Sequence, residues 1–483
     1  MRLSALAAAA GIVLPGRSEA QVTGFAIDNR KVAPGTVFGA FQGATVNGED
    51  FIPAAITAGA VAVVARPEAR FEGAVHIADA NPRKAFARLA AQFFQPVPGT
   101  IVAVTGTNGK TSTVEMTRQL WRMLGERSAS IGTLGVTTSD ESVSTGLTTP
   151  DIVTFLANMH GLQREGVTHV AYEASSHGLS QYRNEGLRVQ AGAFTNLSRD
   201  HLDYHKDMED YFAAKMRLFG EVVEPEGAAV IWADDDWSSR AVEHARSGGL
   251  RLFTVGQGGE AIRLSSRTPT QLGQVLEIEH AGQLRKLNLP LIGAYQVANA
   301  LVSAGLVIAT GGDAARTFDA LTRLQPVRGR LERAAIARSG APVYVDYAHT
   351  PDALEAAIAA LRPHCTGRLL VVFGAGGDRD QGKRPEMGRI AAEQAELGIV
   401  TDDNPRGEDP AAIRAMVLAG GNGALREVGD RRAAIAAAIA EAGPQDIVLI
   451  AGKGHEQGQI IGAGADTRVL PFDDVTVARE CAA

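Results

Sequence analysis

The chain has 483 residues, enough at about 150 residues per domain for roughly three domains with cores of their own. Its 47 basic and 54 acidic residues give a net charge of -7, which excludes the general basic field of a nucleic-acid-binding protein. The two cysteines, Cys365 and Cys481, are too few for a disulfide framework and lack metal-ligand spacing, which favours a reducing compartment. The 54 glycines predict many tight turns between strands and helices.

The first residues form an apolar stretch that has two interpretations. Arg2 is followed by a run rich in alanine and leucine as far as Leu14, which has the shape either of a short secretory signal or of a helix packed on the first domain. Apolar length alone does not separate the two. No other stretch approaches 18 uninterrupted apolar residues, so no membrane-spanning helix is predicted.

A small α/β domain is predicted over residues 1–97. Short β-rich pieces alternate there with alanine-rich helical ones, with strands at 23–27, 37–41 and 61–65 and a helix at 83–94. The run from Gln95 to Gly99 contains two prolines and breaks any helix, because proline lacks the backbone donor and restricts the residue before it. The first domain boundary is placed there.

Two larger domains are predicted to follow. A second break at Gln325-Pro326-Val327 closes the largest domain, residues 98–326. In residues 327–483, buried-looking strands recur, each followed by a loop with glycine or proline and then a helical pattern; they lie at 342–346, 369–373, 397–400 and 447–451. Strands that alternate with helices indicate a parallel sheet whose ligands bind at the carboxyl ends of its strands. The predicted fold is α/β throughout, with a P-loop ATPase-like central domain and a Rossmann-like carboxy-terminal domain.

The clearest local signal is a phosphate-binding loop. An apolar strand from Ile101 leads into Gly106-Thr107-Asn108-Gly109-Lys110-Thr111-Ser112, and a helix is predicted to follow as far as Leu124. Glycines let backbone amides face phosphate oxygens, Lys110 would neutralise the terminal phosphates, and the Thr111 hydroxyl would reach Mg²⁺. The loop is shorter than a usual Walker loop, since position 104 is Val where that pattern has glycine. The alternative is an ordinary strand-to-helix turn.

Two further strand ends carry candidate metal ligands. Glu173 ends an apolar strand that includes Val170, and His201 lies in a segment rich in Asp and His after the apolar residues 191–194. Because the carboxyl ends of parallel strands meet at one edge, both side chains could share a site with Thr111. Oxygen ligands with one imidazole suit Mg²⁺ or Mn²⁺ better than Zn²⁺. His201 and His205, four residues apart, could instead bind zinc or be purely structural.

The shortened loop Thr-Gly-Thr-Asn-Gly-Lys-Thr resembles that of the Mur ligase family, the ATP-dependent enzymes that form peptide bonds in bacterial cell-wall synthesis, and the resemblance extends over all three predicted domains. By its pattern alone, Lys215 is a solvated lysine on an amphipathic helix that begins near Met208. The run Tyr-Phe-Ala-Ala-Lys is, however, similar to the family motif whose lysine is carbamylated and helps to hold a second magnesium. The resemblance therefore implies that Lys215 acts in catalysis together with Lys110, Glu173 and His201.

The resemblance also implies ATP contacts outside the loop. Arg330 matches a nucleotide-contacting arginine of the family, and Asp346 and His349 match the element that faces ATP from the third domain. Taken alone, Asp346 and His349 could equally be loop-capping residues. Asn299 falls where the family has its adenine-side helix, although this chain has Tyr-Gln at positions 295–296 where the family commonly has His-Asn.

Three elements of the last domain resemble those of family members that add meso-2,6-diaminopimelate. They are the segment around Arg379, the tetrapeptide Asp403-Asn404-Pro405-Arg406, and the run from Gly452 to Glu456. Diaminopimelate carries a second carboxylate, which an arginine fork binds through two parallel hydrogen bonds, whereas lysine would bring an ammonium that Arg406 repels. Glu456 can accept hydrogen bonds from a ligand amine. The tetrapeptide could alternatively be turn chemistry, since Asn-Pro is a common start of a turn.

The first two domains carry the implied contacts to a nucleotide-sugar substrate, UDP-MurNAc-L-Ala-D-Glu. The uridine diphosphate side comprises Ile27, Asn29, Ala44, Thr45 and Val46, where the family's usual Asp-Ser-Arg is Asp-Asn-Arg in this chain. The dipeptide side comprises Thr148, Thr149, Ser175, Gln181 and Arg183. Hydroxyl, amide and guanidinium groups suit a polar, anionic ligand.

The resemblance implies a ligase that adds meso-diaminopimelate to the γ-carboxylate of D-glutamate through an acyl phosphate, with ATP and Mg²⁺ as cofactors, in cytoplasmic peptidoglycan synthesis. The alternatives are another ligase of this fold, such as folylpolyglutamate synthase, and a P-loop ATPase switch that needs neither substrate. Because ATP and the UDP-linked precursor are cytosolic, residues 1–14 are expected to form a packed helix. The family expectation is a monomer with small-molecule substrates, without nucleic-acid or membrane partners.

Overall fold

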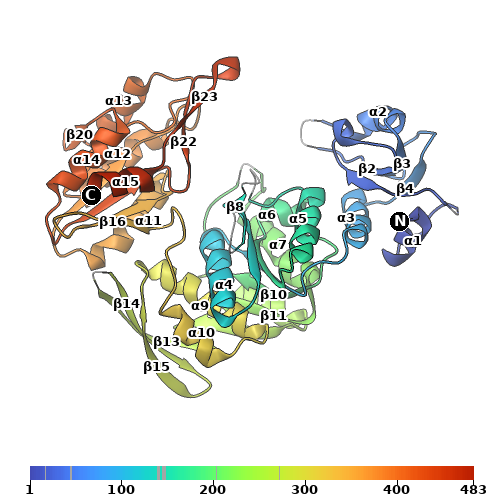
Figure 1. Cartoon of the computed structure of the whole chain (residues 1–483), viewed down its shortest axis with the longest axis horizontal. Coiled ribbons are helices and arrows are strands. Elements are labelled where there is room, and N and C mark those ends of the chain that lie inside the picture. Colours follow the sequence, from blue (N-terminus) through green and yellow to red (C-terminus); the bar gives the residue numbers. More distant parts are fainter. Residues whose placement is uncertain (17, 44–45, 139–141, 144–147, 203, 271) are drawn as a thin grey trace. The chain divides into compact units, whose positions relative to one another are not determined.

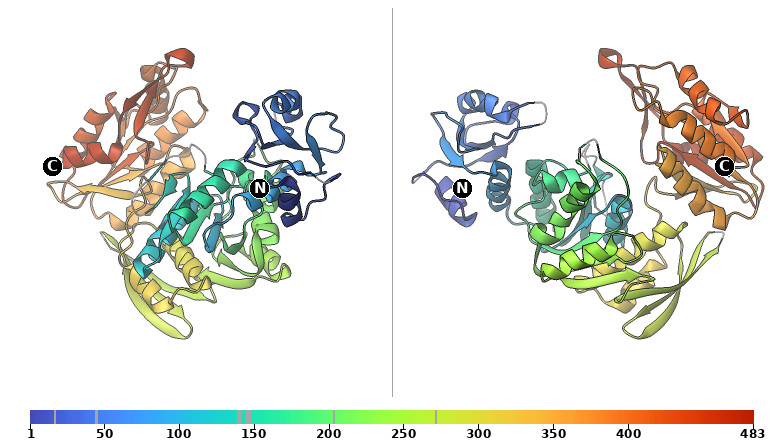
Figure 2. Two further views of the ribbon diagram at one scale, coloured as in Figure 1. Left: turned by 45° about the vertical axis from the view of Figure 1, so that its right-hand side comes forward. Right: turned by 180° about the vertical axis from the view of Figure 1, so that it is seen from behind.

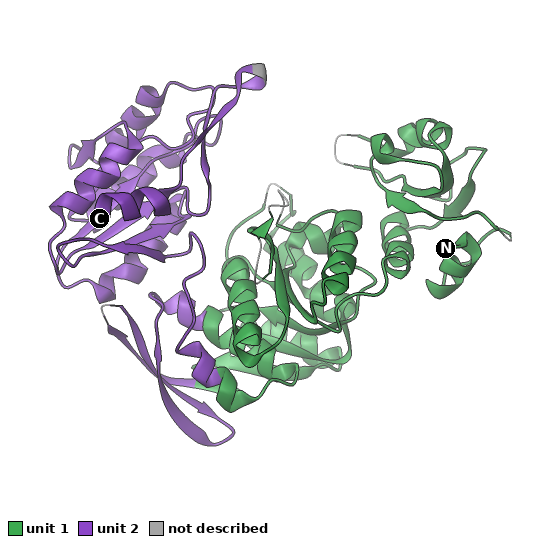
Figure 3. Ribbon diagram, in the orientation of Figure 1, with its two compact units in different colours: residues 1–263, 299–317 green, residues 264–298, 318–483 purple. Residues whose placement is uncertain are grey.

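The computed structural model spans residues 1–483 and describes all of them except 17, 44–45, 139–141, 144–147, 203 and 271 (Figure 1). The chain forms two compact units, Met1–Arg263 with Asn299–Thr317 and Leu264–Ala298 with Phe318–Ala483 (Figure 3). Both units combine helices with largely parallel sheets, so the predicted α/β class is confirmed.

The first unit begins with a parallel sheet that is covered by helices on both faces (Figure 2). Its strands are, in spatial order, β1 (Gly24–Ala26), β2 (Thr36–Gly39), β3 (Ala60–Ala65) and β4 (Val75–Ala78). Successive side chains of a strand point to opposite faces. Val37 accordingly joins the core that contains helix α3 (Pro82–Phe93), whereas Phe38 joins a second core with α2 (Ile52–Thr57).

The apolar amino-terminal stretch is a packed helix, as expected. Helix α1 (Leu3–Ala9) buries Leu3 and Leu6 fully in the same core as α3. It ends before Leu14 because Gly11 adopts a φ of 68°, a left-handed conformation in which the amide of Ile12 returns to the carbonyl of Ala7 at 2.8 Å. Within the described part of the chain, no helix is long and apolar enough to cross a membrane.

A second sheet carries the phosphate loop. The strands of this sheet that lie wholly in the first unit are, in spatial order, β12 (Arg251–Gly256), β11 (Val223–Trp232), β10 (Val189–Phe194), β5 (Thr100–Thr105), β9 (His169–Glu173), β6 (Ser128–Gly132), β7 (Gly135–Thr137) and β8 (Ser142–Val143). The run from β12 to β6 is parallel, and β7 and β8 are antiparallel. The register pairs Val104 with Glu173 and Thr105 with Phe194. The carboxyl ends of β5, β9 and β10 therefore meet at one edge.

Helix α4 (Lys110–Leu124) starts and ends where the sequence predicts. Gly109 before it and Gly125 after it have φ values of 86° and 101°, which favour glycine. Further helices connect successive strands of this sheet along the chain. They are α5 (Ile152–Arg164), α6 (Ser176–Ser180), α7 (Met208–Arg217), the π-helical turn η3 (Leu218–Val222) and α8 (Ser238–Ser247). Helices α9 (Ala294–Ala309) and α10 (Ala314–Leu321) include the chain crossings between the units.

The second unit contains a ribbon that was not predicted from the sequence. The ribbon consists of β13 (Ile262–Thr270), which starts at the end of the first unit, β14 (Gly273–His280) and β15 (Gln283–Leu289). The pairing of β14 with β15 is antiparallel from Gln274 opposite Leu289 to His280 opposite Gln283. Buried and partly exposed residues alternate along β14, which is typical of a strand with one solvated face.

The carboxy-terminal sheet has the predicted parallel strands. Its spatial order is β16 (Glu332–Ile336), β17 (Pro342–Asp346), β21 (Ile447–Ala451), β18 (Leu369–Phe373), β19 (Leu397–Val400) and β20 (Leu425–Glu427). Only the edge strand β16 is antiparallel among these. One face packs on α11 (Pro351–Leu361), α12 (Lys383–Gln394) and α13 (Pro410–Gly420), and the other on α14 (Arg431–Glu441) and α15 (Asp474–Ala482). A hairpin of β22 (Gly458–Ile461) and β23 (Arg468–Pro471) follows the last sheet strand.

Candidate active site

The phosphate loop at the end of β5 is folded around its own lysine. Lys110 Nζ donates hydrogen bonds to the carbonyl oxygens of Gly106 at 2.9 Å and Thr107 at 2.8 Å. Asn196, in the segment after β10, accepts from the Asn108 amide at 2.9 Å. The ammonium and the loop amides before a helix amino end form a positively polarised cradle of the kind that binds phosphate.

The two loop glycines are required by close packing. At Gly106, whose φ is 148°, a Cβ atom would lie 1.9 Å from Thr195 Oγ1. At Gly109, whose φ is 86°, a Cβ atom would lie 2.3 Å from Asn299 Oδ1. Asn299, the predicted adenine-side residue of α9, therefore lies directly against the loop, and Thr113 of α4 donates to its Oδ1 at 3.4 Å. The buried Ser112 follows in the first turn of α4.

The carboxylate of Glu173 lies next to the Thr111 hydroxyl, as the shared strand edge predicts. Thr111 Oγ1 donates to Glu173 Oε1 at 2.9 Å, and the backbone amide of Thr133 donates to the same oxygen at 2.7 Å. Thr133 Oγ1 reaches Oε2 at 3.2 Å. Glu173 is 2% exposed. A buried carboxylate beside a hydroxyl is the donor set that Mg²⁺ prefers, so these residues fit a magnesium ion. Thr133 carries no sequence signal and was missed.

Lys215 is buried, so the interpretation as a solvated surface lysine is wrong. Its side chain on α7 is 1% exposed, Nζ donates to the Gly106 carbonyl at 2.7 Å, and the ammonium lies 4.3 Å from the Tyr211 ring centroid. Burial, together with the nearby Lys110, lowers the pKa of Lys215 well below its ordinary value. The helix face that carries Lys215 faces the phosphate loop rather than solvent. Tyr211, which sequence analysis did not select, also bonds the Thr107 hydroxyl at 3.3 Å.

His201 lies beside this cluster and remains half exposed. Its side chain is 44% exposed, its Nε2 lies 3.5 Å from Asp200 Oδ2, and its ring centroid is 6.0 Å from that of Tyr211. The alternative zinc partner His205 is 2% exposed and lies 3.3 Å from Asp210 Oδ2 through Nδ1. Among the described residues, no group of three or more His, Cys, Asp or Glu side chains could hold a metal ion.

The predicted dipeptide contacts form one connected group around the end of β9: Thr148, Thr149, Ser175, Gln181 and Arg183. Thr149 Oγ1 donates to the Glu173 carbonyl at 2.8 Å and lies 3.0 Å from Ser175 Oγ. Arg183 donates through Nη1 to the Thr149 carbonyl at 2.8 Å and through Nη2 to Gln181 Oε1 at 2.7 Å. Thr148 Oγ1 lies 3.1 Å from Thr133 Oγ1. Polar groups from three loops are therefore gathered beside the candidate metal site.

The predicted uridine diphosphate contacts that the structure describes lie outside the strands of the first sheet, in the segments that follow β1 and β2. Ile27 and Val46 are 38% and 54% exposed, which is unusual for apolar side chains of this size. Asn29 begins a short 3₁₀ turn whose cap, Asp28, accepts hydrogen bonds from Arg30. Those hydrogen bonds lower the pKa of Asp28 to about 2. Ala44 and Thr45 lie outside the described residues.

In the second unit, the predicted nucleotide contacts surround Tyr347. The Arg330 guanidinium lies 5.0 Å from the Tyr347 ring centroid, and His349 Nδ1 bonds the Tyr347 carbonyl at 2.8 Å. Asp346, at the end of β17, accepts from the Leu331 amide at 2.7 Å, and burial raises its pKa to about 6. Thr350, rather than His349, caps helix α11. Tyr347 itself was not selected from the sequence.

Two of the three diaminopimelate-type motifs, Asp403–Arg406 and Gly452–Glu456, form one cluster in the second unit. Lys453 is fully buried, and its Nζ lies 2.8 Å from Asn404 Oδ1, 3.4 Å from Asp403 Oδ1 and 3.4 Å from Glu456 Oε2. Asn404 Nδ2 also donates to Glu456 Oε2 at 2.8 Å. At Gly452, whose φ is 122°, a Cβ atom would lie 2.8 Å from Asp403 Oδ2. Lys453 occupies the centre of the cluster, although the sequence pattern gave it no role.

Arg406 is held at the edge of this cluster by backbone carbonyls. Its Nη1 donates to the Gly377 carbonyl at 2.9 Å and lies 3.5 Å from the Asn404 carbonyl. A Cβ atom on Gly377 would lie 1.9 Å from the Pro405 carbonyl oxygen, so the loop that bears Arg379 packs directly on the loop of Arg406. Arg379 is exposed. The structure therefore brings all three predicted motifs to the carboxyl end of one sheet.

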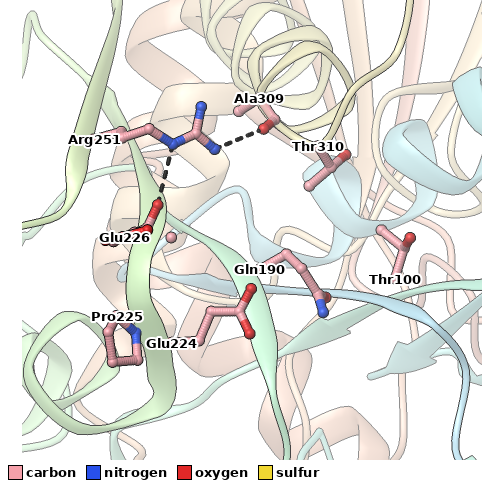
Figure 4. A pocket seen from close by; sticks show the side chains of 9 residues that line it. Thr100, Gln190, Glu224, Pro225, Glu226, Arg251, Ala309 and Thr310 are labelled. Atoms are coloured by element: carbon pink, nitrogen blue, oxygen red, sulfur yellow. Dashed lines mark hydrogen bonds between the residues drawn. The ribbon is translucent and has the colours of Figure 1, made fainter.

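A separate hollow of about 370 Å³ lies at the opposite edge of the phosphate-loop sheet (Figure 4). Arg251 at the start of β12 donates to the carbonyls of Glu226 and Ala309, both at 3.1 Å. Gln190 accepts from the Ile101 amide at 2.6 Å. These polar side chains satisfy backbone groups of parallel strands near their amino ends and of the last residue of α9, whereas ligands of such sheets bind at the carboxyl ends.

Family models match this chain in three consecutive regions. The matches are "Mur ligase family, catalytic domain" over residues 21–94, "Mur ligase middle domain" over 104–307 and "Mur ligase, glutamate ligase domain" over 329–454. The chain belongs to the Mur ligase family and has its three-domain architecture.

Relatives with one particular name match over the whole chain. A UDP-N-acetylmuramoyl-L-alanyl-D-glutamate–2,6-diaminopimelate ligase of Zymomonas mobilis is 61% identical over 466 residues, which cover 96% of each chain. A solved structure of a ligase with that name has a TM-score of 0.75 and 32% identity, covering 99% of this chain and 98% of the other. Folylpolyglutamate synthase of Mycobacterium tuberculosis, solved with ADP and AMPPCP, has a TM-score of 0.60 at 20% identity, covers 77% of this chain and 92% of that one, and shares the fold.

Proposed function

We propose that this protein is the UDP-N-acetylmuramoyl-L-alanyl-D-glutamate–2,6-diaminopimelate ligase of its cell. It joins meso-2,6-diaminopimelate to the γ-carboxylate of D-glutamate at the cost of ATP. The observation that carries the proposal is the cluster in which Lys453 joins Asp403, Asn404 and Glu456 beside Arg406. Full-length relatives with this name support it.

The division of labour follows the three proposed domains. Residues 1–97 hold the uridine diphosphate, residues 98–326 hold ATP, the metal and the dipeptide, and residues 327–483 hold the incoming amino acid. Arg330, Asp346 and His349 of the last domain are proposed nucleotide contacts. We further propose a monomeric enzyme in the cytoplasm, where ATP and the UDP-linked precursor are found.

The first half-reaction brings a carboxylate to a polyphosphate, so anion must approach anion. Lys110 and the loop amides offset this repulsion and stabilise the negative charge of the phosphoryl group during its transfer to the carboxylate. Thr111 and Glu173 would hold Mg²⁺, which supplies further charge neutralisation when bound. His201 and Lys215, the latter as a carbamate, are proposed ligands of a second ion. The buried, neutral amine favoured at Lys215 is the form that reacts with carbon dioxide.

The second half-reaction needs an oriented amine that displaces phosphate from the acyl phosphate. Asp403 and Glu456 carry the carboxylates that can bind the ammonium groups of the amino acid. Arg406 and Arg379 can bind its carboxylates. The guanidinium donors of Arg406 suit the second carboxylate of diaminopimelate, whereas lysine would bring an ammonium, which they cannot bind. The chemistry of the cluster therefore matches a zwitterion with two amino-acid heads.

A phosphate-release assay tests this proposal. Phosphate should appear only when ATP, the UDP-linked dipeptide and diaminopimelate are all present. Phosphate release with glutamate in place of diaminopimelate would support the activity of a folylpolyglutamate synthase, to which this chain is similar only in fold. Turnover of ATP without either co-substrate would instead identify an ATPase switch and overturn the ligase proposal.

A further inference from the structure

A fully buried ion pair lies behind the amino-acid cluster, outside all three sequence motifs. Arg431, the first residue of α14, and Asp474, the first residue of α15, are each completely buried. Arg431 Nε and Nη2 donate to the two carboxylate oxygens of Asp474 at 2.7 and 2.6 Å. This two-point geometry fixes the plane and the direction of the guanidinium.

The remaining donors of Arg431 reach two backbone carbonyls. Nη2 donates to the carbonyl of Ala451 at 3.0 Å, and Nη1 donates to the carbonyl of Asp402 at 3.3 Å. Ala451 is the last residue of β21 and directly precedes Gly452. Asp402 directly precedes Asp403. One guanidinium therefore binds the residue before each of the two motifs.

The sheet order shows why this bridge is needed. β21 and the strand before Asp402, β19, are not neighbours, because β18 lies between them. The hydrogen bonds of β18 to both strands place the strand ends, but no strand pairing joins the two loops that follow them. Between the loops the described contacts are made by side chains, chiefly by Lys453, and by the close approach of Gly452 to Asp403. Beyond them, the Arg406 amide donates to the Ile460 carbonyl at 3.1 Å.

We propose that Arg431 and Asp474 are positioning residues for the amino-acid substrate: they hold the Asp403–Arg406 loop and the Gly452–Glu456 loop at the separation that binds it. This inference rests on the proposed function and deepens it. The Arg431 side chain is fully buried, and its hydrogen bonds go to Asp474 and to the two backbone carbonyls. Its effect is on the geometry of Asp403, Asn404 and Glu456, and errors of about 1 Å in such geometry can cost 10²-fold in rate.

The test compares the Michaelis constants of the purified full-length enzyme for its three substrates. Arg431→Met alone leaves Asp474 as an unpaired buried charge and is expected to unfold readily. The double variant Arg431→Met/Asp474→Leu removes both charges, so folding is preserved while both carbonyl contacts are lost. Arg431→Lys keeps the charge but loses the fork. Arg432→Ala is the matched control, because Arg432 pairs with Glu480 across the same two helices on the surface.

We expect the KM for diaminopimelate to rise at least about tenfold in the double variant, with the KM for ATP and for the UDP-linked dipeptide unchanged, and to rise less in Arg431→Lys. Arg432→Ala should match the wild type. A wild-type KM for diaminopimelate in the double variant would overturn the inference, as would an equal rise for all three substrates with a lower Tm. If the wild type makes no product with diaminopimelate, the proposed function itself fails.

Discussion

Replacing Arg406 tests how the enzyme selects its amino acid. Within the described residues, the side-chain hydrogen bonds of Arg406 are made through Nη1 alone, to the carbonyls of Gly377 and Asn404. Nε and Nη2 therefore retain the parallel N–H groups that a carboxylate binds at two points. Hydrogen bonds to a charged partner contribute about 1.5–3 kcal/mol each, and the two together are not additive.

For Arg406→Ala we expect a loss of about 3 kcal/mol of binding, which corresponds to a rise of about 100-fold in the KM for diaminopimelate. The KM for the UDP-linked dipeptide should stay within about twofold. Arg406→Lys keeps a charge but not the fork, so an intermediate rise is expected. Initial rates of phosphate release at varied diaminopimelate measure this directly.

The control is Arg426→Ala. Arg426 lies on β20 of the same sheet and forms an exposed ion pair with Glu441 of α14. Loss of this ion pair should leave all three KM values unchanged. A diaminopimelate KM in Arg406→Ala equal to that of the wild type would refute the assignment of a ligand carboxylate to Arg406.

Three further outcomes are expected. Glu173→Gln keeps an acceptor for Thr111 but removes the charge, so the Mg²⁺ concentration needed for half-maximal rate should rise at least about tenfold in a Mg²⁺ titration, and an unchanged titration would exclude Glu173 as a ligand. Removal of bicarbonate and carbon dioxide should lower kcat reversibly, because the carbamate on Lys215 would be lost. Equal rates with and without them would exclude a carbamate. The pKa of Asp346 is raised from 3.8 to about 6, so its ionisation destabilises the folded state as pH rises through that interval. Asp346→Asn should therefore increase the free energy of unfolding, measured in urea, by up to about 3 kcal/mol at pH 7.5 and by progressively less toward pH 4. A difference that does not change with pH would contradict this cause.

Local patterns predicted the parts of the fold that depend on local physics. The strands 342–346, 369–373, 397–400 and 447–451 are observed with those bounds, because continuous apolar runs between turn residues are typical of buried parallel strands. The ribbon β13–β15 was missed, because its strands are rich in polar and charged residues and lack the continuous apolar run of the buried parallel strands.

The site divides in the same way. The contact of Thr111 with Glu173 was predictable from the sequence, because the topology of parallel sheets fixes where strand ends meet. The same rule explains why three motifs that each follow a strand lie at one sheet edge. The roles of Thr133, Lys453 and Arg431 depend on contacts between residues far apart in the chain, which no spacing encodes. The burial of Lys215 likewise depends on the packing of α7 against the phosphate loop.

We propose that this enzyme adds diaminopimelate, rather than lysine or glutamate, to the UDP-linked dipeptide. The most direct measurement is a competition in which equimolar meso-diaminopimelate, L-lysine and L-glutamate are supplied with ATP and the UDP-linked dipeptide, and the nucleotide products are weighed by mass spectrometry. A diaminopimelate-containing tripeptide should be the dominant product. A product that contains mainly lysine or glutamate, or ADP formation without any new amide, would contradict it.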